Sequence, residues 1–198
     1  MIEIFYAGGP VMYPLLLCSV ITVAIIFERS FFWLRCRNGR RPELITELCS
    51  RTENGQQEFS DGINSDIVAR VLIEGLESPL SEMSWRLQQA AVREAVEVNR
   101  YLDVLNTMVS LAPLLGIFGT VLGIIESFQL LGDASLIDPV AASGGLAQAL
   151  ITTAFGLGIA MPSLIAYQIF QSKSANLRFE METHATELEL SLGLETTV

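Results

Sequence analysis

Charged side chains are absent from three long stretches of this sequence, and their absence indicates the class of the protein. The uncharged stretches are 11–27, 104–125 and 139–172. An α-helix rises about 1.5 Å per residue, so roughly 20 apolar residues cross a hydrocarbon core of about 30 Å. With 51% hydrophobic residues, the chain is too apolar for an ordinary soluble domain. We therefore predict an all-α membrane protein with three transmembrane helices.

Basic residues are absent from 1–28 and 101–172, which gives the predicted spans an orientation. Because Lys and Arg concentrate on the cytoplasmic side of membrane proteins, the N-terminus is predicted to lie outside. The predicted order is a short periplasmic N-terminus (1–11), transmembrane helix 1 (12–34), a cytoplasmic helical region (35–103), transmembrane helix 2 (104–131), a periplasmic loop (132–143), transmembrane helix 3 (144–170) and a cytoplasmic tail (171–198).

Residues that bind metals or perform covalent catalysis are scarce. The three cysteines, Cys18, Cys36 and Cys49, form no CxxC pair, and the one histidine, His184, lies in the predicted tail. We predict free thiols, no metal site and no cofactor. No motif pairs a nucleophile with a base, and the basic residues are too dispersed for nucleic acid, so neither an enzyme nor a nucleic-acid-binding protein is expected. Because the N-terminus lacks the basic region of a signal peptide, the first span is expected to remain as an anchor.

Helical patterns continue outside the predicted spans. Residues 51–66 are rich in turn-forming residues and are predicted to be a linker. Apolar residues recur at helical spacing in 67–76 and 85–105, and the second of these helices is expected to run straight into span two. The tail is expected to continue span three in the same way. The protein is thus predicted to carry long cytoplasmic helical extensions that pack on one another.

Small and polar residues form a stripe on each of the last two spans. At about 100° per residue, one such stripe includes Thr120 and the other includes Thr153. The glycines predicted to pack helices closely are Gly116, Gly119, Gly123 and Gly156. Two interpretations remain open: helix packing, with each hydroxyl bonded to a carbonyl of its own helix one turn earlier, or a functional lining.

The same two regions resemble the paired signatures of a known family. The segments LAPLLGIFGTVLGIIESF and GGLAQALITTAFGLGIAMPSLIAYQIF are similar to those of the ExbB/TolQ/MotA proton-channel family. The resemblance is strongest over 107–170 and is closest to the ExbB/TolQ branch, because MotA-type subunits have four spans. The ending IIFERSF of the first span and the three-span arrangement extend it in outline.

This resemblance implies a multi-pass subunit of the bacterial inner membrane that forms a homopentamer around a dimeric partner of ExbD/TolR type. The partner contributes single transmembrane helices with an aspartate past which protons move, and a TonB- or TolA-like protein is energised. Two family threonines that face the pore fall on Thr120 and Thr153. Their hydroxyls donate and accept hydrogen bonds but do not titrate near neutral pH, so the chain alone is not expected to conduct protons.

Three other polar residues lie in or near the membrane segments. Gln148 stands where the family commonly has a glutamate, and it keeps the hydrogen-bonding capacity without the titratable proton. By helical angle Gln148 and Thr152 share a face about 100–140° from Thr153, which favours a contact between subunits. Glu126 near the outer end of span two is expected to be interfacial, solvated or between subunits, with a proton entry site as the alternative.

Charged residues and prolines at two further places carry structural expectations. Glu28 and Arg29 at the inner end of span one are interpreted as a pair whose charged ends extend to the membrane surface. Pro113 and Pro162 are predicted to mark bends.

Two functions are considered for the chain. The first is a proton-channel and stator subunit that couples proton-motive force, through the partner, to outer-membrane transport or envelope maintenance. The alternative is a passive oligomeric membrane scaffold without ion conduction, and Gln148 in place of the glutamate favours it. Membrane lipid is an expected contact in both.

Overall fold

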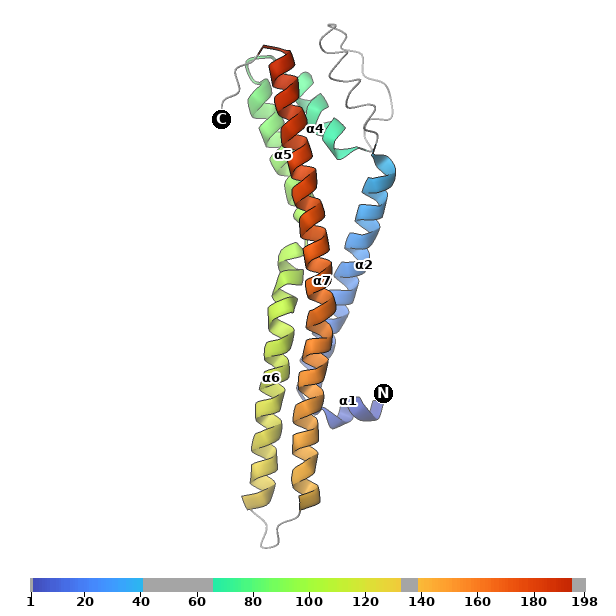
Figure 1. Cartoon of the computed structure of the whole chain (residues 1–198), viewed down its shortest axis with the longest axis vertical. Helices are drawn as coiled ribbons and strands as arrows, with labels where there is room; N and C mark the ends of the chain where they lie inside the picture. The colour runs from blue at the N-terminus through green and yellow to red at the C-terminus, as the bar shows by residue number, and fades with distance from the viewer. Residues whose placement is uncertain (1, 41–65, 133–138, 194–198) are drawn as a thin grey trace. The chain divides into compact units, whose positions relative to one another are not determined.

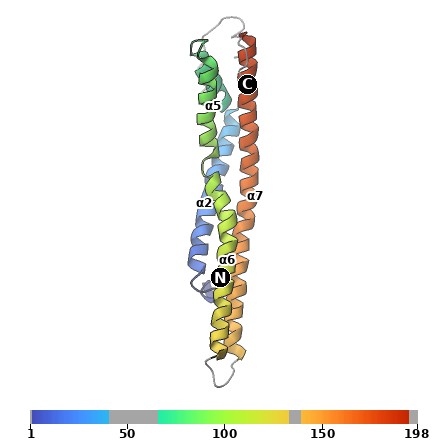
Figure 2. The ribbon, with the colours of Figure 1, turned by 90° about the vertical axis from the view of Figure 1, so that its left-hand side faces the viewer.

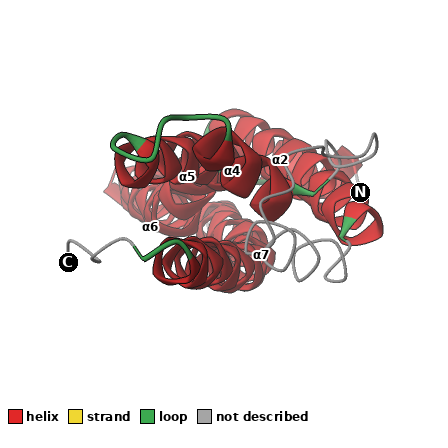
Figure 3. Ribbon diagram, turned by 90° about the horizontal axis from the view of Figure 1, so that it is seen from above, coloured by secondary structure: helices red, strands yellow, loops and turns green. Residues whose placement is uncertain are grey.

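The computed structural model describes residues 2–40, 66–132 and 139–193, which form helices and the turns between them (Figures 1 and 3). No strand occurs within these ranges, and the helical stretches Met12–Gly39, Met83–Gln129 and Ser143–Ser191 are long and apolar enough to cross a membrane. The prediction of an all-α membrane protein is confirmed. The helices are α1 (Ile2–Ala7), α2 (Met12–Gly39), α4 (Ile67–Leu76), α5 (Met83–Asn99), α6 (Leu102–Gly132) and α7 (Pro139–Ser191).

The chain divides into two compact units. Unit 1 consists of Met1–Glu28 and Tyr101–Ile169, and unit 2 consists of Arg29–Arg100 and Phe170–Val198. Unit 1 therefore contains α1, the first part of α2, α6 and the first part of α7. Unit 2 contains the end of α2, α4, α5 and the end of α7.

The core of unit 1 lies between α2, α6 and α7. Within this unit α6 and α7 lie side by side, as both side views show (Figures 1 and 2). The buried core residues are Val11, Met12, Leu15, Cys18, Met108, Ala112, Ile159 and Ala160. Large apolar side chains such as Phe118, Leu150 and Ile165 remain exposed on the outer faces of α6 and α7. Such a surface suits contact with lipid or with other subunits rather than with water.

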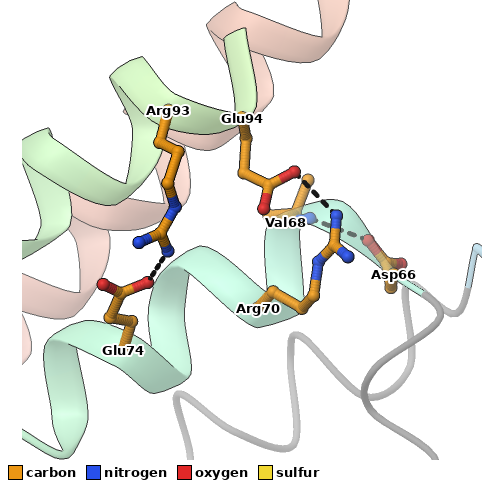
Figure 4. Close-up of polar contacts among 6 residues, drawn as sticks. All are labelled: Asp66, Val68, Arg70, Glu74, Arg93 and Glu94. Carbon is orange, nitrogen blue, oxygen red and sulfur yellow. Dashed lines mark hydrogen bonds and ion pairs between the residues drawn. The ribbon is translucent and has the colours of Figure 1, made fainter. Parts of the chain in front are cut away.

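The core of unit 2 joins α4 and α5 to the second part of α7. Asp66 begins α4 as its N-cap, and its side chain accepts a hydrogen bond of 3.0 Å from the backbone N–H of Val68. Ion pairs then connect α4 to α5 (Figure 4): Arg70 lies 2.7 Å from Glu94, and Arg93 pairs with Glu74. The buried core residues are Ile67, Val68, Val71, Leu72, Met83, Leu87, Ala90, Val98, Leu177, Met181 and Leu188.

Most helical expectations outside the spans agree with the structure. The predicted helix 67–76 is confirmed by α4, and the predicted continuation of span three into the tail is confirmed by α7. α7 begins at Pro139, earlier than the predicted 144, and proline is favourable at a first helical position because its missing N–H needs no partner there. Residues 51–65 of the predicted linker and Cys49 lie outside the described residues, whereas Cys18 and Cys36 are free thiols as predicted.

The prediction that the helix of 85–105 runs straight into span two is wrong. α5 ends at Asn99 and α6 begins at Leu102. Arg100 has φ −50° and ψ 134°, and Tyr101 has φ +65°. These angles match the two central positions of a type II β-turn, the second of which favours glycine. The sequence has neither glycine nor proline at this point, and its apolar residues keep helical spacing, so it gave no sign of the turn.

The interpretation of Arg29 as a residue that extends to the membrane surface is also wrong. Its residue is only 1% exposed, and its Nη1 donates to the backbone carbonyls of Glu97 at 3.1 Å and Val98 at 3.3 Å. At the end of α5 the Glu97 carbonyl accepts the amide of Arg100 at 3.2 Å, and the carbonyls of the last helical turn form the negative end of the helix dipole, which favours a buried cation. Pro113 and Pro162 lie inside α6 and α7, which continue past them, and the predicted bends stay a prediction.

Candidate functional site

The two threonines singled out in the sequence meet where α6 packs against α7 in unit 1. The hydroxyls of Thr120 and Thr153 are hydrogen-bonded to each other, and both residues are half-buried. Thr120 Oγ1 lies 3.1 Å from the carbonyl oxygen of Gly116 and 3.2 Å from that of Ala149. Thr153 Oγ1 lies 3.3 Å from the same Gly116 carbonyl. We call these two side chains the hydroxyl pair.

The hydroxyl pair has more acceptors in reach than protons to donate. Each hydroxyl donates one proton, whereas the Gly116 carbonyl, the Ala149 carbonyl and the other hydroxyl all accept. Thr120 can donate to Thr153 while Thr153 donates to Gly116, or Thr153 can donate to Thr120 while Thr120 donates to Ala149. The pair can therefore reverse its hydrogen-bond direction through hydroxyl rotation. In either arrangement both protons are used within the chain, so a water or a carboxyl group beside the pair would meet hydroxyl acceptors, and it would meet a donor only where it displaced one of the carbonyls.

Close approach of the two helix backbones brings the hydroxyls together. A Cβ at Gly116 would lie 3.0 Å from the carbonyl oxygen of Thr152, and a Cβ at Gly156 would lie 2.6 Å from that of Ala112. A Cβ at Gly123 would lie 2.6 Å from the carbonyl oxygen of Gly145. These small residues let α6 and α7 touch through their backbones, which is the packing mode typical of membrane helices.

Thr152 lies inside the same helix contact. Its residue is 0% exposed, and its hydroxyl donates to a carbonyl one turn earlier, with Ala149 at 2.9 Å and Gln148 at 3.2 Å. A Cβ at Gly119 would lie 2.6 Å from Thr152 Cβ, so the two residues pack directly on each other. We therefore assign Thr152 to packing between α6 and α7 rather than to a contact between subunits.

Gln148 and Glu126 have different surroundings from the hydroxyl pair. Gln148 is half-buried and packs against Gly9, where a Cβ would lie 2.6 Å from its Nε2. Gly9 has φ +69°, a conformation that favours glycine, in the turn between α1 and α2. Glu126 is exposed on α6. The carboxamide of Gln148 thus covers the turn that leads into the first span.

A second pair of hydroxyls was missed in the sequence. The hydroxyl oxygen of Ser163 on α7 lies 3.3 Å from that of Thr22 on α2 and 2.7 Å from the Ile159 carbonyl oxygen, and its one proton can go to either. Thr22 and Ser163 are 2% and 0% exposed. The sequence did not single them out, because each apolar run also holds other hydroxyl residues, among them Ser19 in the first and Thr152 and Thr153 in the second. Only their juxtaposition shows that they connect α2 to α7 inside unit 1.

Comparison with known proteins identifies the family of this chain. The model of the MotA/TolQ/ExbB proton channel family matches residues 61–183, which include α4, α5, α6 and the hydroxyl pair. The chain belongs to this family. The resemblance stated from the sequence motifs is thereby confirmed, and the half-buried hydroxyl pair lies within the part of the chain that the family shares.

Two relatives align with most of this chain, and a third aligns with about half of it. It is 31% identical to the putative biopolymer transport protein ExbB-like 1 of Synechocystis over 96% of this chain and 78% of the relative. It is 27% identical to the biopolymer transport protein ExbB of Salmonella typhimurium over 81% of this chain and 71% of the relative. The Tol-Pal system protein TolQ of Pseudomonas aeruginosa is 37% identical over 54% of this chain and 46% of its own length.

Proposed function

We propose that this member of the proton-channel family is the channel and stator subunit of an inner-membrane complex of ExbB–ExbD or TolQ–TolR type. In the proposed complex five copies surround the single transmembrane helices of a dimeric partner that carries a membrane aspartate. Proton flow past that aspartate energises a TonB- or TolA-like protein for outer-membrane transport or envelope maintenance. The family match and the relatives named for biopolymer transport and the Tol-Pal system support the proposal.

The proposed topology has a periplasmic N-terminus and three crossings. Residues 12–34, 104–131 and 144–170 cross the membrane, 132–143 form the periplasmic loop, and 35–103 and 171–198 are cytoplasmic. The distribution of basic residues supports this orientation, because eleven of the twelve lie in the two segments proposed to be cytoplasmic, and the twelfth, Arg29, lies in the inner part of the first span. The exposed apolar faces of α6 and α7 are proposed to contact lipid and neighbouring copies.

The observation that carries the proposal is the hydrogen bond between the Thr120 and Thr153 hydroxyls, in which either residue can be the donor. In the proposed mechanism Thr120 and Thr153 orient water or the carboxyl group of the partner, and their hydroxyls do not hold the transported proton. The membrane potential supplies about 2.3 kcal/mol per charge per 100 mV, so repeated proton steps drive one movement of the partner. The chain alone is therefore expected to be inactive as a conductor.

Replacement of the hydroxyls tests the proposal. Thr120→Val and Thr153→Val keep the branched shape and remove the hydrogen-bonding oxygen. Thr107→Val on α6 is the matched control, because Thr107 is exposed and bonds the carbonyl of Asp103 at 2.8 Å in its own helix. With each variant co-expressed with the single-span partner and reconstituted in liposomes, we expect proton uptake to fall at least about tenfold, equivalent to about 1.4 kcal/mol, for the two pair variants. Uptake at the control level in a double variant that still assembles would refute the proposed role.

The alternative function is a passive oligomeric scaffold. Two observations favour it: the hydroxyl pair is satisfied by partners within the chain, and Gln148 packs on a turn instead of offering a titratable group. Liposomes that contain the chain with its partner separate the two functions. Proton uptake that requires both proteins supports the channel subunit, whereas equal and negligible uptake with and without the partner supports the scaffold.

A further inference from the structure

The junction between α5 and α6 has a conformation that its own sequence does not favour. The turn passes through Arg100 and Tyr101, and Tyr101 is the one residue other than glycine with positive φ among the described residues. Apolar residues keep helical spacing across the junction, from Val98 to Leu102 and Leu105, all of which are buried. The local sequence therefore favours a continuous helix, and the turn depends on contacts with other segments of the chain.

Arg29 contacts the last turn of α5. Its guanidinium donates to the carbonyls of Glu97 and Val98 in the last turn of α5, and it lies 4.6 Å from the centroid of the Phe32 ring. In the turn, the Glu97 carbonyl also accepts the amide of Arg100 at 3.2 Å. In a helix that continued, the carbonyls of Glu97 and Val98 would accept the amides of Tyr101 and Leu102, and Arg29 would compete with those amides. A cation is also favourable at the negative end of a helix dipole. The contact therefore stabilises the interrupted form over the continuous one.

A second contact from α7 holds the same helix end. Ser174 is 0% exposed, and its hydroxyl donates to the side-chain oxygen of Asn99, the last residue of α5, at 2.6 Å. Arg29, Asn99 and Ser174 all belong to unit 2, so three separate segments of one unit meet at the end of α5. The end of this helix is thus fixed by tertiary contacts and not by a capping sequence.

We propose that residues 99–102 form a two-state helix junction and that Arg29 is its positioning residue. With Arg29 bound to the last carbonyls of α5, the chain turns at Arg100 and Tyr101. With Arg29 withdrawn, the backbone continues as helix from α5 into α6, and the amides of Tyr101 and Leu102 replace the guanidinium as donors. This inference does not depend on proton conduction, because it concerns only the backbone conformation of residues 99–102.

Hydrogen exchange of the full chain in lipid nanodiscs tests the junction. Arg29→Met removes the donors and retains most of the side-chain bulk, and Arg35→Met at an exposed position of α2 is the matched control. We expect the backbone amides of residues 101–104 to exchange about tenfold more slowly in Arg29→Met, because a continuous helix protects them. The double variant Arg29→Met/Tyr101→Gly should return to the wild-type rate, because glycine adopts the positive φ of the turn without strain.

The direction of the change separates a junction from ordinary structural damage. A residue that merely stabilised unit 2 would, when replaced, leave these amides of unit 1 unchanged or make them exchange faster, and faster exchange would overturn the proposal. Unchanged exchange in Arg29→Met, or slow exchange that Tyr101→Gly does not reverse, would overturn it as well. If Arg29→Met does not fold, Ser174→Ala removes the second contact and is judged by the same criterion, with slower exchange at 101–104 as the supporting result.

Discussion

At the residue scale, two glycines on α7 show how strongly position decides the role of a small residue. Gly156 faces the backbone of α6 at a distance that excludes a Cβ, whereas a Cβ at Gly158 would meet nothing within 4 Å. Both look alike in the sequence AFGLGIA. The helix contact that brings Thr120 and Thr153 together therefore depends on the first glycine and not on the second.

Alanine substitutions at these glycines should differ in their effect on stability. Gly156→Ala forces α6 and α7 apart, and overpacking of this kind costs typically 1–3 kcal/mol. Gly158→Ala should be neutral or stabilising by up to about 1 kcal/mol, since alanine favours the helix over glycine. Thermal unfolding of the two variants in the same detergent measures the difference, and equal melting temperatures would contradict the packing described here.

The free-energy cost of the turn at Tyr101 can be compared with the contribution of the Arg29 hydrogen bonds. A left-handed conformation costs roughly 1–2 kcal/mol for a residue other than glycine. Hydrogen bonds that involve a charged group contribute about 1.5–3 kcal/mol each. The two carbonyl contacts of Arg29, about 3–6 kcal/mol together, are therefore sufficient to hold the turn.

At the element scale, α4 and α5 are connected by two kinds of contact that differ in strength. The ion pairs Arg70–Glu94 and Arg93–Glu74 lie on the surface, with Arg93 64% exposed in its side chain (Figure 4). Exposed ion pairs contribute little, typically below 1 kcal/mol, because water and salt screen them. Leu72 of α4 is 0% exposed and belongs to the core that includes Leu87 of α5.

Loss of the buried contact should lower the free energy of unfolding more than loss of a surface ion pair. Leu72→Ala leaves a cavity in the core of unit 2 and should lower the free energy of unfolding by about 2–5 kcal/mol. Arg93→Gln removes one surface ion pair and should lower it by less than about 1 kcal/mol. Chemical denaturation of the two variants in detergent micelles, followed by circular dichroism, gives the comparison. A larger effect of Arg93→Gln than of Leu72→Ala would show that the ion pairs hold α4 in place.

At the scale of the whole molecule, composition and charge distribution support the proposed topology together. Uncharged stretches give three helical segments long enough to cross a membrane, and all basic residues except Arg29 lie in the segments assigned to the cytoplasm. Two exposed side chains report on the two sides: Tyr6 of α1 is 72% exposed and Phe179 of α7 is 69% exposed.

Cysteine labelling at these positions tests the orientation. In a chain whose native cysteines are replaced by alanine, Tyr6→Cys should react with a membrane-impermeant maleimide in cells with only the outer membrane permeabilised. Phe179→Cys should react only after the inner membrane is opened. The reverse pattern would mean that the N-terminus is cytoplasmic. Labelling of both cysteines while the inner membrane is intact would place the end of α7 in the periplasm and contradict the proposed topology.

The sequence by itself determined the class of protein, the three apolar helices, the helix at 67–76 and the stripes that carry Thr120 and Thr153. These follow from local composition and periodicity, which act within one helix. The tertiary structure decided which hydroxyls meet, that Thr152 is buried, that Thr22 pairs with Ser163, and that the chain turns at Tyr101. Each of these depends on contacts between residues far apart in the chain, and above all on a buried arginine 68 residues before the carbonyl it binds.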